Sequence, residues 1–213
     1  MNLHAFDHEE TMLRDIKDGM PDSLERALLV LSGLKTEAGI RSYQHEIDDI
    51  FGRFLNKCNC QNLFEQSGAP LYLHRSLAKC LFEYLWNSKP KRFGESFLLT
   101  AVLDAQLDSN VNRLVGTCVG LTSLYSILGL RVGLNLSLLV ALDHLLSRLR
   151  VGQQTIDMDH TDPQGFDCRS GDGMREFPLW TLTANVLNSR GLKNEASGQF
   201  LAAKGDYHKA ILA

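Results

Sequence analysis

The sequence predicts an α+β protein, in which a block of helices comes first, a small antiparallel sheet follows and further helices end the chain. Apolar residues recur every three to four positions over much of residues 23–107, which is typical of amphipathic helices. Residues 134–161 are rich in β-compatible side chains and contain a Gly-Gln turn, which favours strands. A helical pattern returns from residue 179 onward. Together these three observations predict the fold class.

Four helices are predicted in the first half of the chain, at 23–39, 43–57, 75–86 and 95–107. In the first of them, Ser23 is positioned to cap the N-terminus and Gly39 to close the C-terminus. Pro90 lies just beyond the third, where a helix is expected to have ended. These helices define an N-terminal helical region at residues 1–108.

The core region, residues 109–178, begins with an apolar helix headed by Cys118. The run 134–142 reads as a strand, although its many leucines leave a helix open. The segments 144–151 and 154–161 flank Gly152-Gln153 and are expected to pair as an antiparallel hairpin. Residues 162–173 are expected to form a loop because of their Gly, Pro and Asp content.

This hairpin would bring polar side chains together. His144 lies near the start of one strand, and Asp157 and Asp159 lie on its neighbour, both on the same face because side chains alternate. One of the two carboxylates could therefore hold the imidazole. A thiol in the first turn of a helix lies at the positive end of the helix dipole, which lowers its pKa. The pattern fits a catalytic triad, although a lone cysteine or histidine in such a setting is more often an ordinary packing residue.

Residues from about 23 to 173 resemble the transglutaminase-like superfamily, in its SirB1-related branch. The resemblance rests on "FLLTAVLDAQLDSNVNRLVGTCVGLTSLYSILGLRVGL", "DHLLSRL" and "TIDMDHTDPQGFD". It implies a papain-like fold with a Cys118–His144–Asp157 triad, in which Asp159 is the alternative third member. Many SirB1-related proteins have Pro in the region of the nucleophile, whereas this chain has Cys118, as the active branches do.

The chain departs from this family pattern at two positions. Asp143 stands where the family has Gly before the histidine, and Met158 stands where it has Pro after Ile-Asp. Papain-like sites also place an amide side chain upstream to help bind the oxyanion. Asn112 is the residue that we expect in this role, with Asn110 as the other candidate, although a loop Asn is more often a cap or turn residue.

Three features of the sequence resemble metal sites, but each fails in a specific way, so neither a metal nor a cofactor is expected. The acidic segment "DMDHTDPQGFDC" fails as a calcium loop because it lacks the required Gly at its sixth position and the closing Glu at its twelfth. A metal site would need side chains from the hairpin to converge on one ion, with His144, Asp157, Asp159 and His160 as the candidates. This is unfavourable, because His160 would point to the other face of the strand from the two aspartates. The "CNC" pair at 58–60 has no second cluster to accompany it.

The C-terminal segment, residues 179–213, resembles part of a tetratricopeptide repeat through "GQFLAAKGDYHKAILA". That comparison places the turn between the two helices at Gly205-Asp206-Tyr207 and leaves a short second helix. We therefore expect the chain to be part of a longer protein, in which further helical repeats follow the C-terminus. If the chain is complete as given, Phe200, Leu201 and Ile211 are expected to be buried against the core or against a second copy of the chain.

The composition and charge of the chain exclude some classes of function. The net charge of -3 and the absence of a long basic stripe argue against nucleic acid as a partner. The polar, acidic N-terminus is unlike a signal peptide and 134–142 is too short to span a bilayer, so we expect a cytoplasmic protein that does not cross a membrane.

The expected function is a cysteine hydrolase or acyltransferase that acts on an amide or peptide bond of a protein or peptide substrate, with hydrolysis favoured because water is the default acceptor. The alternative is a catalytically silent module that binds proteins through the same fold, which the departures at Asp143 and Met158 favour slightly.

Overall fold

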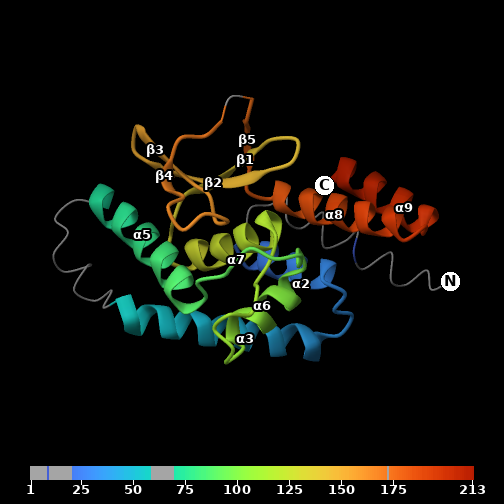
Figure 1. Ribbon diagram of the computed structural model, residues 1–213, viewed down its shortest axis with the longest axis horizontal. Helices are drawn as coiled ribbons and strands as arrows, with labels where there is room; N and C mark the ends of the chain where they lie inside the picture. Colours follow the sequence, from blue (N-terminus) through green and yellow to red (C-terminus); the bar gives the residue numbers. More distant parts are fainter. Residues whose placement is uncertain (1–8, 10–20, 59–69, 172) are drawn as a thin grey trace.

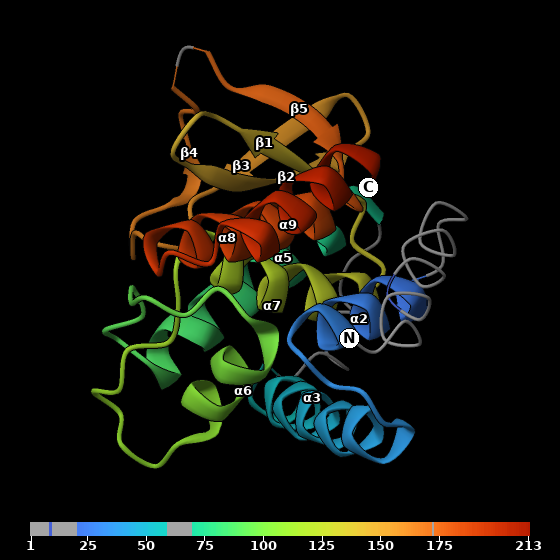
Figure 2. The same cartoon turned by 90° about the vertical axis from the view of Figure 1, so that its right-hand side faces the viewer.

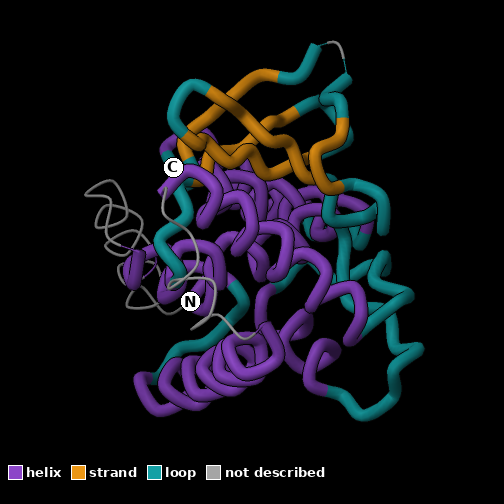
Figure 3. Tube along the Cα trace, turned by 90° about the vertical axis from the view of Figure 1, so that its left-hand side faces the viewer, coloured by secondary structure: helices purple, strands orange, loops and turns teal. Residues whose placement is uncertain are grey.

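The α+β pattern is confirmed in a computed structural model, which describes residues 9, 21–58, 70–171 and 173–213. Within this part the chain forms seven helices and a five-stranded sheet (Figure 1). The strands gather at one end of the molecule, and helices make up the rest (Figure 3). The second half of the "CNC" pair, Cys60, lies outside the described residues. None of the helices in the described ranges combines the length and the hydropathy that a membrane span requires.

The helical block consists of α2 (Pro21–Leu31), α3 (Glu37–Cys58), α5 (Pro70–Ser88) and α6 (Leu99–Leu107). The single helix predicted at 23–39 is wrong, because the chain breaks between α2 and α3. Gly33 adopts a φ of 97°, and its N–H donates to the carbonyl of Val30, which closes α2. Ser23 lies inside α2, and Gly39 lies inside α3, so neither acts as the predicted cap.

The sheet is antiparallel with the strand order β4-β3-β2-β1-β5. Its strands are β1 (Leu136–Val140), β2 (Leu145–Val151), β3 (Gln154–Met158), β4 (Phe166–Cys168) and β5 (Arg175–Pro178). The hairpin predicted around Gly152 is confirmed, with Val151 opposite Gln154. The strand reading of 134–142 is also confirmed. Sequence reasoning missed β4, which lies within the predicted loop at 162–173, and β5, because both are too short to show a clear alternation.

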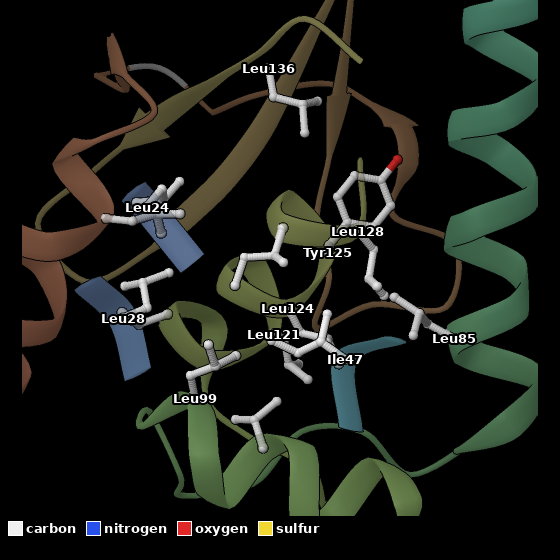
Figure 4. Packing of buried hydrophobic residues seen from close by; sticks show 14 of the residues in the cluster. Leu24, Leu28, Ile47, Leu85, Leu99, Leu121, Leu124, Tyr125, Leu128 and Leu136 are labelled. Atoms are coloured by element: carbon white, nitrogen blue, oxygen red, sulfur yellow. The ribbon is translucent and has the colours of Figure 1, made fainter. Parts of the chain in front are cut away.

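Helix α7 (Cys118–Arg131) lies between the sheet and the long α3 (Figure 2). Every residue from Val119 to Gly129 is buried, which explains why this segment is apolar on all sides rather than amphipathic. Leu121, Leu124, Tyr125 and Leu128 of α7 meet side chains from the surrounding helices and from β1 (Figure 4). One hydrophobic cluster contains residues from all three predicted regions, including Leu182 and Leu187 of α8 (Thr181–Ala196).

The C-terminal segment forms a helical hairpin of α8 (Thr181–Ala196) and α9 (Phe200–Leu212). The predicted turn at Gly205-Asp206-Tyr207 is wrong, because these residues lie inside α9. The turn is instead at Gly198, which has a φ of 73°. Gly191 allows the close packing of the two helices, since a Cβ there would lie 2.5 Å from the Tyr207 ring.

Ion pairs connect the two helices of this hairpin to each other and to Glu9. Arg190 donates to Asp206 and to Glu9, and Lys209 also donates to Glu9 at 2.7 Å. Phe200, Leu201 and Ile211 are not covered by the rest of the described chain; Leu201 is 90% exposed. Of the two kinds of cover expected for these three residues, burial against the core does not occur in the described chain, and burial against a second copy stays a prediction.

Candidate functional site

Cys118 is the first residue of α7, as the sequence predicts. Thr117 caps the helix through its side-chain oxygen, which accepts a hydrogen bond from the Gly120 N–H at 3.4 Å. The Thr117 N–H donates to the carbonyl of Ser96 at 2.8 Å and so ties the helix start to the segment before α6. A Cβ at Gly120 would lie 2.6 Å from that carbonyl oxygen. The small residues around the cysteine therefore allow this close approach.

The thiol of Cys118 is half-buried, and burial raises its pKa. Hydrogen bonds from the backbone amides of Val119 and Leu145 act in the opposite direction, while the charge of Asp159 adds to the rise. The net pKa is raised. The amides at the helix start do lower the pKa of this thiol, as expected, but desolvation outweighs them. Nucleophilic attack by Cys118 would require a base that removes its proton.

His144 is held in place directly before β2. Its carbonyl accepts from the Ala141 N–H at 2.9 Å, which closes the loop between β1 and β2. Its Nε2 lies 2.7 Å from Oδ2 of Asp159. The other ring nitrogen, Nδ1, is thereby left for a second partner. The backbone amide of the neighbouring residue Leu145 hydrogen-bonds the sulfur of Cys118, and Cys118 and His144 line the same cleft.

Asp159 is fixed by more than the histidine. Its Oδ1 accepts from the hydroxyl of Thr161 at 2.6 Å and from the Thr161 N–H at 2.8 Å. Burial raises the pKa of Asp159, but the hydrogen bonds from Thr161 and His144 outweigh burial, and the net pKa is lowered. The carboxylate therefore stays ionised at neutral pH and can orient the imidazole.

Asp157 does not contact the histidine, which corrects the triad that the resemblance implies. Asp157 lies directly opposite Arg148 in the β2–β3 register. Its two carboxylate oxygens accept from the Arg148 guanidinium at 2.7 and 2.8 Å. Arg148 also donates to Glu176 of β5 at 3.1 Å. Asp157 thus belongs to an ion-pair network on the sheet, and Asp159, the alternative, is the partner of His144.

A cleft of about 260 Å³ contains both Cys118 and His144. The loop between β1 and β2 and the helix α8 contribute most of its other residues. The lining residues are Phe97, Thr117, Cys118, Val119, Ala141, Leu142, Asp143, His144, Leu145, Asn185, Asn188, Ser189 and Leu192. Asp159 is not among them, so it contacts the histidine from outside the cleft.

Asn112 does not reach this cleft, and the oxyanion role expected for it is not supported. It is exposed, and its N–H donates to Oδ1 of Asn110 at 3.0 Å in the loop before α7. Asn110 does not line the cleft either. Two amide side chains that sequence reasoning missed, Asn185 and Asn188 of α8, lie in the cleft instead. Asparagine is a poor helix former, so its occurrence three times inside α8 was a usable signal, although the third, Asn194, donates to Asp206 and does not line the cleft.

His160 lies in the core, as its position one residue out of phase with Asp159 predicts. Its Nε2 is 2.8 Å from the hydroxyl oxygen of Ser147, and its ring packs on Tyr125 with centroids 4.2 Å apart. Burial, together with the charge of Arg92, lowers the pKa of His160 to about 3, although the charge of Asp159 opposes this. Among the residues that the structure describes, no group of three or more His, Cys, Asp or Glu side chains could hold a metal.

This burial predicts a stability loss in mild acid. The folded pKa of about 3 lies below the value of roughly 6.5 for an exposed histidine, so the unfolded chain binds the additional proton between these two pH values. We expect the free energy of unfolding to fall as the pH drops below about 6.5, by on the order of 1 kcal/mol per pH unit from this group. Urea unfolding of the wild type and of His160→Asn at several pH values would measure the difference. Equal slopes for the two proteins would contradict a neutral, buried His160.

The remaining cysteines lie elsewhere. Cys168 is in β4, where its Sγ contacts the Asp157 carbonyl at 3.6 Å, and burial raises its pKa. Cys58 ends α3, and Cys80 lies within α5. Of the four described cysteines, only Cys118 lies in the cleft.

Comparisons with protein-family models, curated proteins and solved structures found no match to this chain.

Proposed function

We propose that this protein is a transglutaminase-like cysteine hydrolase or acyltransferase that acts on an amide or peptide bond through Cys118, His144 and Asp159. One observation carries the proposal. A histidine bound to an ionised carboxylate at 2.7 Å shares a cleft with a cysteine at the first position of a buried helix. The order nucleophile, base and orienting acid is the arrangement that activates a weak nucleophile.

The chemistry follows from the protonation states. Because burial keeps Cys118 as a thiol, Nδ1 of His144 takes the proton as the sulfur bonds to the carbonyl carbon of the substrate. The carbonyl oxygen becomes an oxyanion, which the backbone amides around the sulfur, such as that of Val119, can stabilise. The imidazolium then gives its proton to the leaving amine, and a thioester remains. Water, activated by the same histidine, releases the acid; an amine in place of water would give acyl transfer.

The experiment is acylation by p-nitrophenyl acetate, an activated ester that needs little recognition. We expect a burst of p-nitrophenolate and an acetyl group on Cys118, located by peptide mapping. Cys118→Ala should remove the burst, while the matched variants Cys80→Ala and Cys168→Ala should keep it. Acetylation spread over the other cysteines, with Cys118 unmodified, would contradict the proposal.

The second candidate is the catalytically silent binding module. The observation that favours it is the uncovered apolar surface of α9, where Phe200 is 67% exposed and Ile211 is 83% exposed. This reading requires no reaction at Cys118. The acylation experiment therefore separates the two functions.

A further inference from the structure

Two exposed leucines line the cleft from different parts of the chain. Leu142 lies in the loop between β1 and β2 and is fully exposed, and Leu192 lies on α8 and is 56% exposed. Phe97, which is almost completely buried, lines the same cleft. Single exposed apolar residues need no explanation, but here two of them share one cleft with a thiol and a histidine. The cleft therefore offers apolar contact beside the nucleophile.

The polar groups of the cleft that lie outside the proposed triad suit a peptide group rather than an ion. Asn188 is exposed on α8, and an amide side chain both donates and accepts hydrogen bonds, as a peptide group does. Asn185 is partly committed, since its Nδ2 donates to the Thr181 carbonyl at 2.8 Å. Asp143 and His144 are the charged or titratable lining residues besides the cysteine, and neither Lys nor Arg lines the cleft. A phosphate or carboxylate group would find no fixed cation there.

The volume of the cleft limits the size of the ligand group that it can hold. Pockets for drug-sized molecules occupy roughly 300–1,000 Å³, and this cleft, at about 260 Å³, is smaller. It suits one side chain together with the adjoining peptide group. Burial of an apolar side chain there would remove the exposed surface of Leu142 and Leu192 from water as well.

We infer that α8 and the β1–β2 loop select the substrate, which is a peptide or protein with an apolar side chain on the residue that supplies the scissile carbonyl. That side chain packs between Leu142 and Leu192, and Asn188 pairs with the adjoining peptide group. The inference rests on the proposed function, because it concerns the same cleft. It gives the C-terminal hairpin, which resembles a repeat unit in sequence, a direct part in recognition.

Two chloromethyl ketones of single acetylated residues, one of leucine and one of alanine, test this selection. In each, the sulfur of Cys118 bonds to the methylene carbon, chloride leaves with its electron pair, and the thiol proton passes to His144. We expect the leucine probe to alkylate Cys118 about 10-fold faster than the alanine probe, as a few buried methylene groups would give. The ratio of the two rates within each variant is the measured quantity.

Leu192→Glu and Leu142→Glu should bring this ratio close to 1. The matched control is Leu201→Glu, which places the same change on the exposed face of α9 and should keep the wild-type ratio. Asn188→Ala should slow both probes and leave the ratio unchanged. Because all four positions are exposed, the variants are expected to fold, which circular dichroism would check.

The outcomes separate this inference from the proposed function. Alkylation of Cys118 at equal rates by both probes, or a wild-type ratio in Leu192→Glu, would overturn the inference and leave the proposed function standing. No alkylation of Cys118 by either probe, together with no acylation by p-nitrophenyl acetate, would overturn both.

Discussion

Replacement of His144 by alanine should slow acylation of Cys118 by about 100-fold or more at neutral pH. General base catalysis by a positioned side chain contributes roughly 100- to 10,000-fold, and here the thiol has particular need of it because burial raises its pKa. Without the imidazole, Cys118 reacts only in the fraction of molecules in which its thiol is already ionised. The rate of the variant should therefore rise about tenfold per pH unit, and it should continue to rise beyond about 8.5, the ordinary pKa of a cysteine, because the pKa of Cys118 is raised.

The burst of p-nitrophenolate, followed at several pH values, measures this difference. His45→Ala is the matched control, since His45 is an exposed residue of α3 and does not line the cleft. It should react as the wild type does. A His144→Ala protein that keeps the wild-type rate and pH profile would show that Cys118 reacts without the histidine, and the catalytic reading would lose its base.

Local patterns in the sequence were sufficient for the elements that carry the candidate site. The Gly152-Gln153 turn set the β2–β3 register correctly, because strand side chains alternate and the turn fixes the pairing. The small residues before Cys118 correctly indicated the start of a helix. These features depend on neighbours within a few residues, which a sequence displays directly.

The choice between Asp157 and Asp159 depended on where regular pairing ends, and that is a tertiary property. Alternation places both on one face only while the strand continues. In the structure β3 ends at Met158, and the ladder to β4 shifts register between Asp157 and Met158. Asp159 therefore lies beyond the strand, free to approach His144, while Asp157 remains opposite Arg148.

The amide side chains of the cleft could not be assigned for a related reason. Asn185 and Asn188 come from α8, more than 60 residues after Cys118, and only the packing of α8 on α2 and α7 brings them to the site. The Asn112 prediction relied instead on the resemblance to papain-like sites, which places an amide side chain upstream of the cysteine. The pKa of Cys118 was misjudged similarly, because the helix start is local and visible, whereas the burial that outweighs it comes from the fold.

Alanine substitution of Asp159 should lower activity, whereas alanine substitution of Asp157 should lower stability. Asp159→Ala removes the carboxylate that orients His144, and we expect acylation to slow by about 100-fold or more, since the orienting acid of a triad has effects of this size or larger. Asp157→Ala removes a partner of the half-buried Arg148 guanidinium. This variant should leave acylation near the wild-type rate. It should lower the free energy of unfolding by about 1–3 kcal/mol, because Arg148 loses two hydrogen bonds. The loss is limited because Arg148 keeps its contact with Glu176.

Acylation kinetics and urea unfolding of both variants measure this crossed pattern, and Asp159→Asn shows whether the tautomer of His144 is the cause. An asparagine amide can donate to Nε2 of His144 and so favour the tautomer that carries its proton on Nδ1, which cannot take the thiol proton; this variant should therefore stay about 100-fold slow or more, as Asp159→Ala does. Asp159 would then act as a positioning residue through the histidine. If Asp157→Ala instead stops acylation while Asp159→Ala reacts normally, the triad contains the wrong carboxylate. Loss of stability without loss of activity in Asp159→Ala would leave His144 and Asp159 as a structural pair.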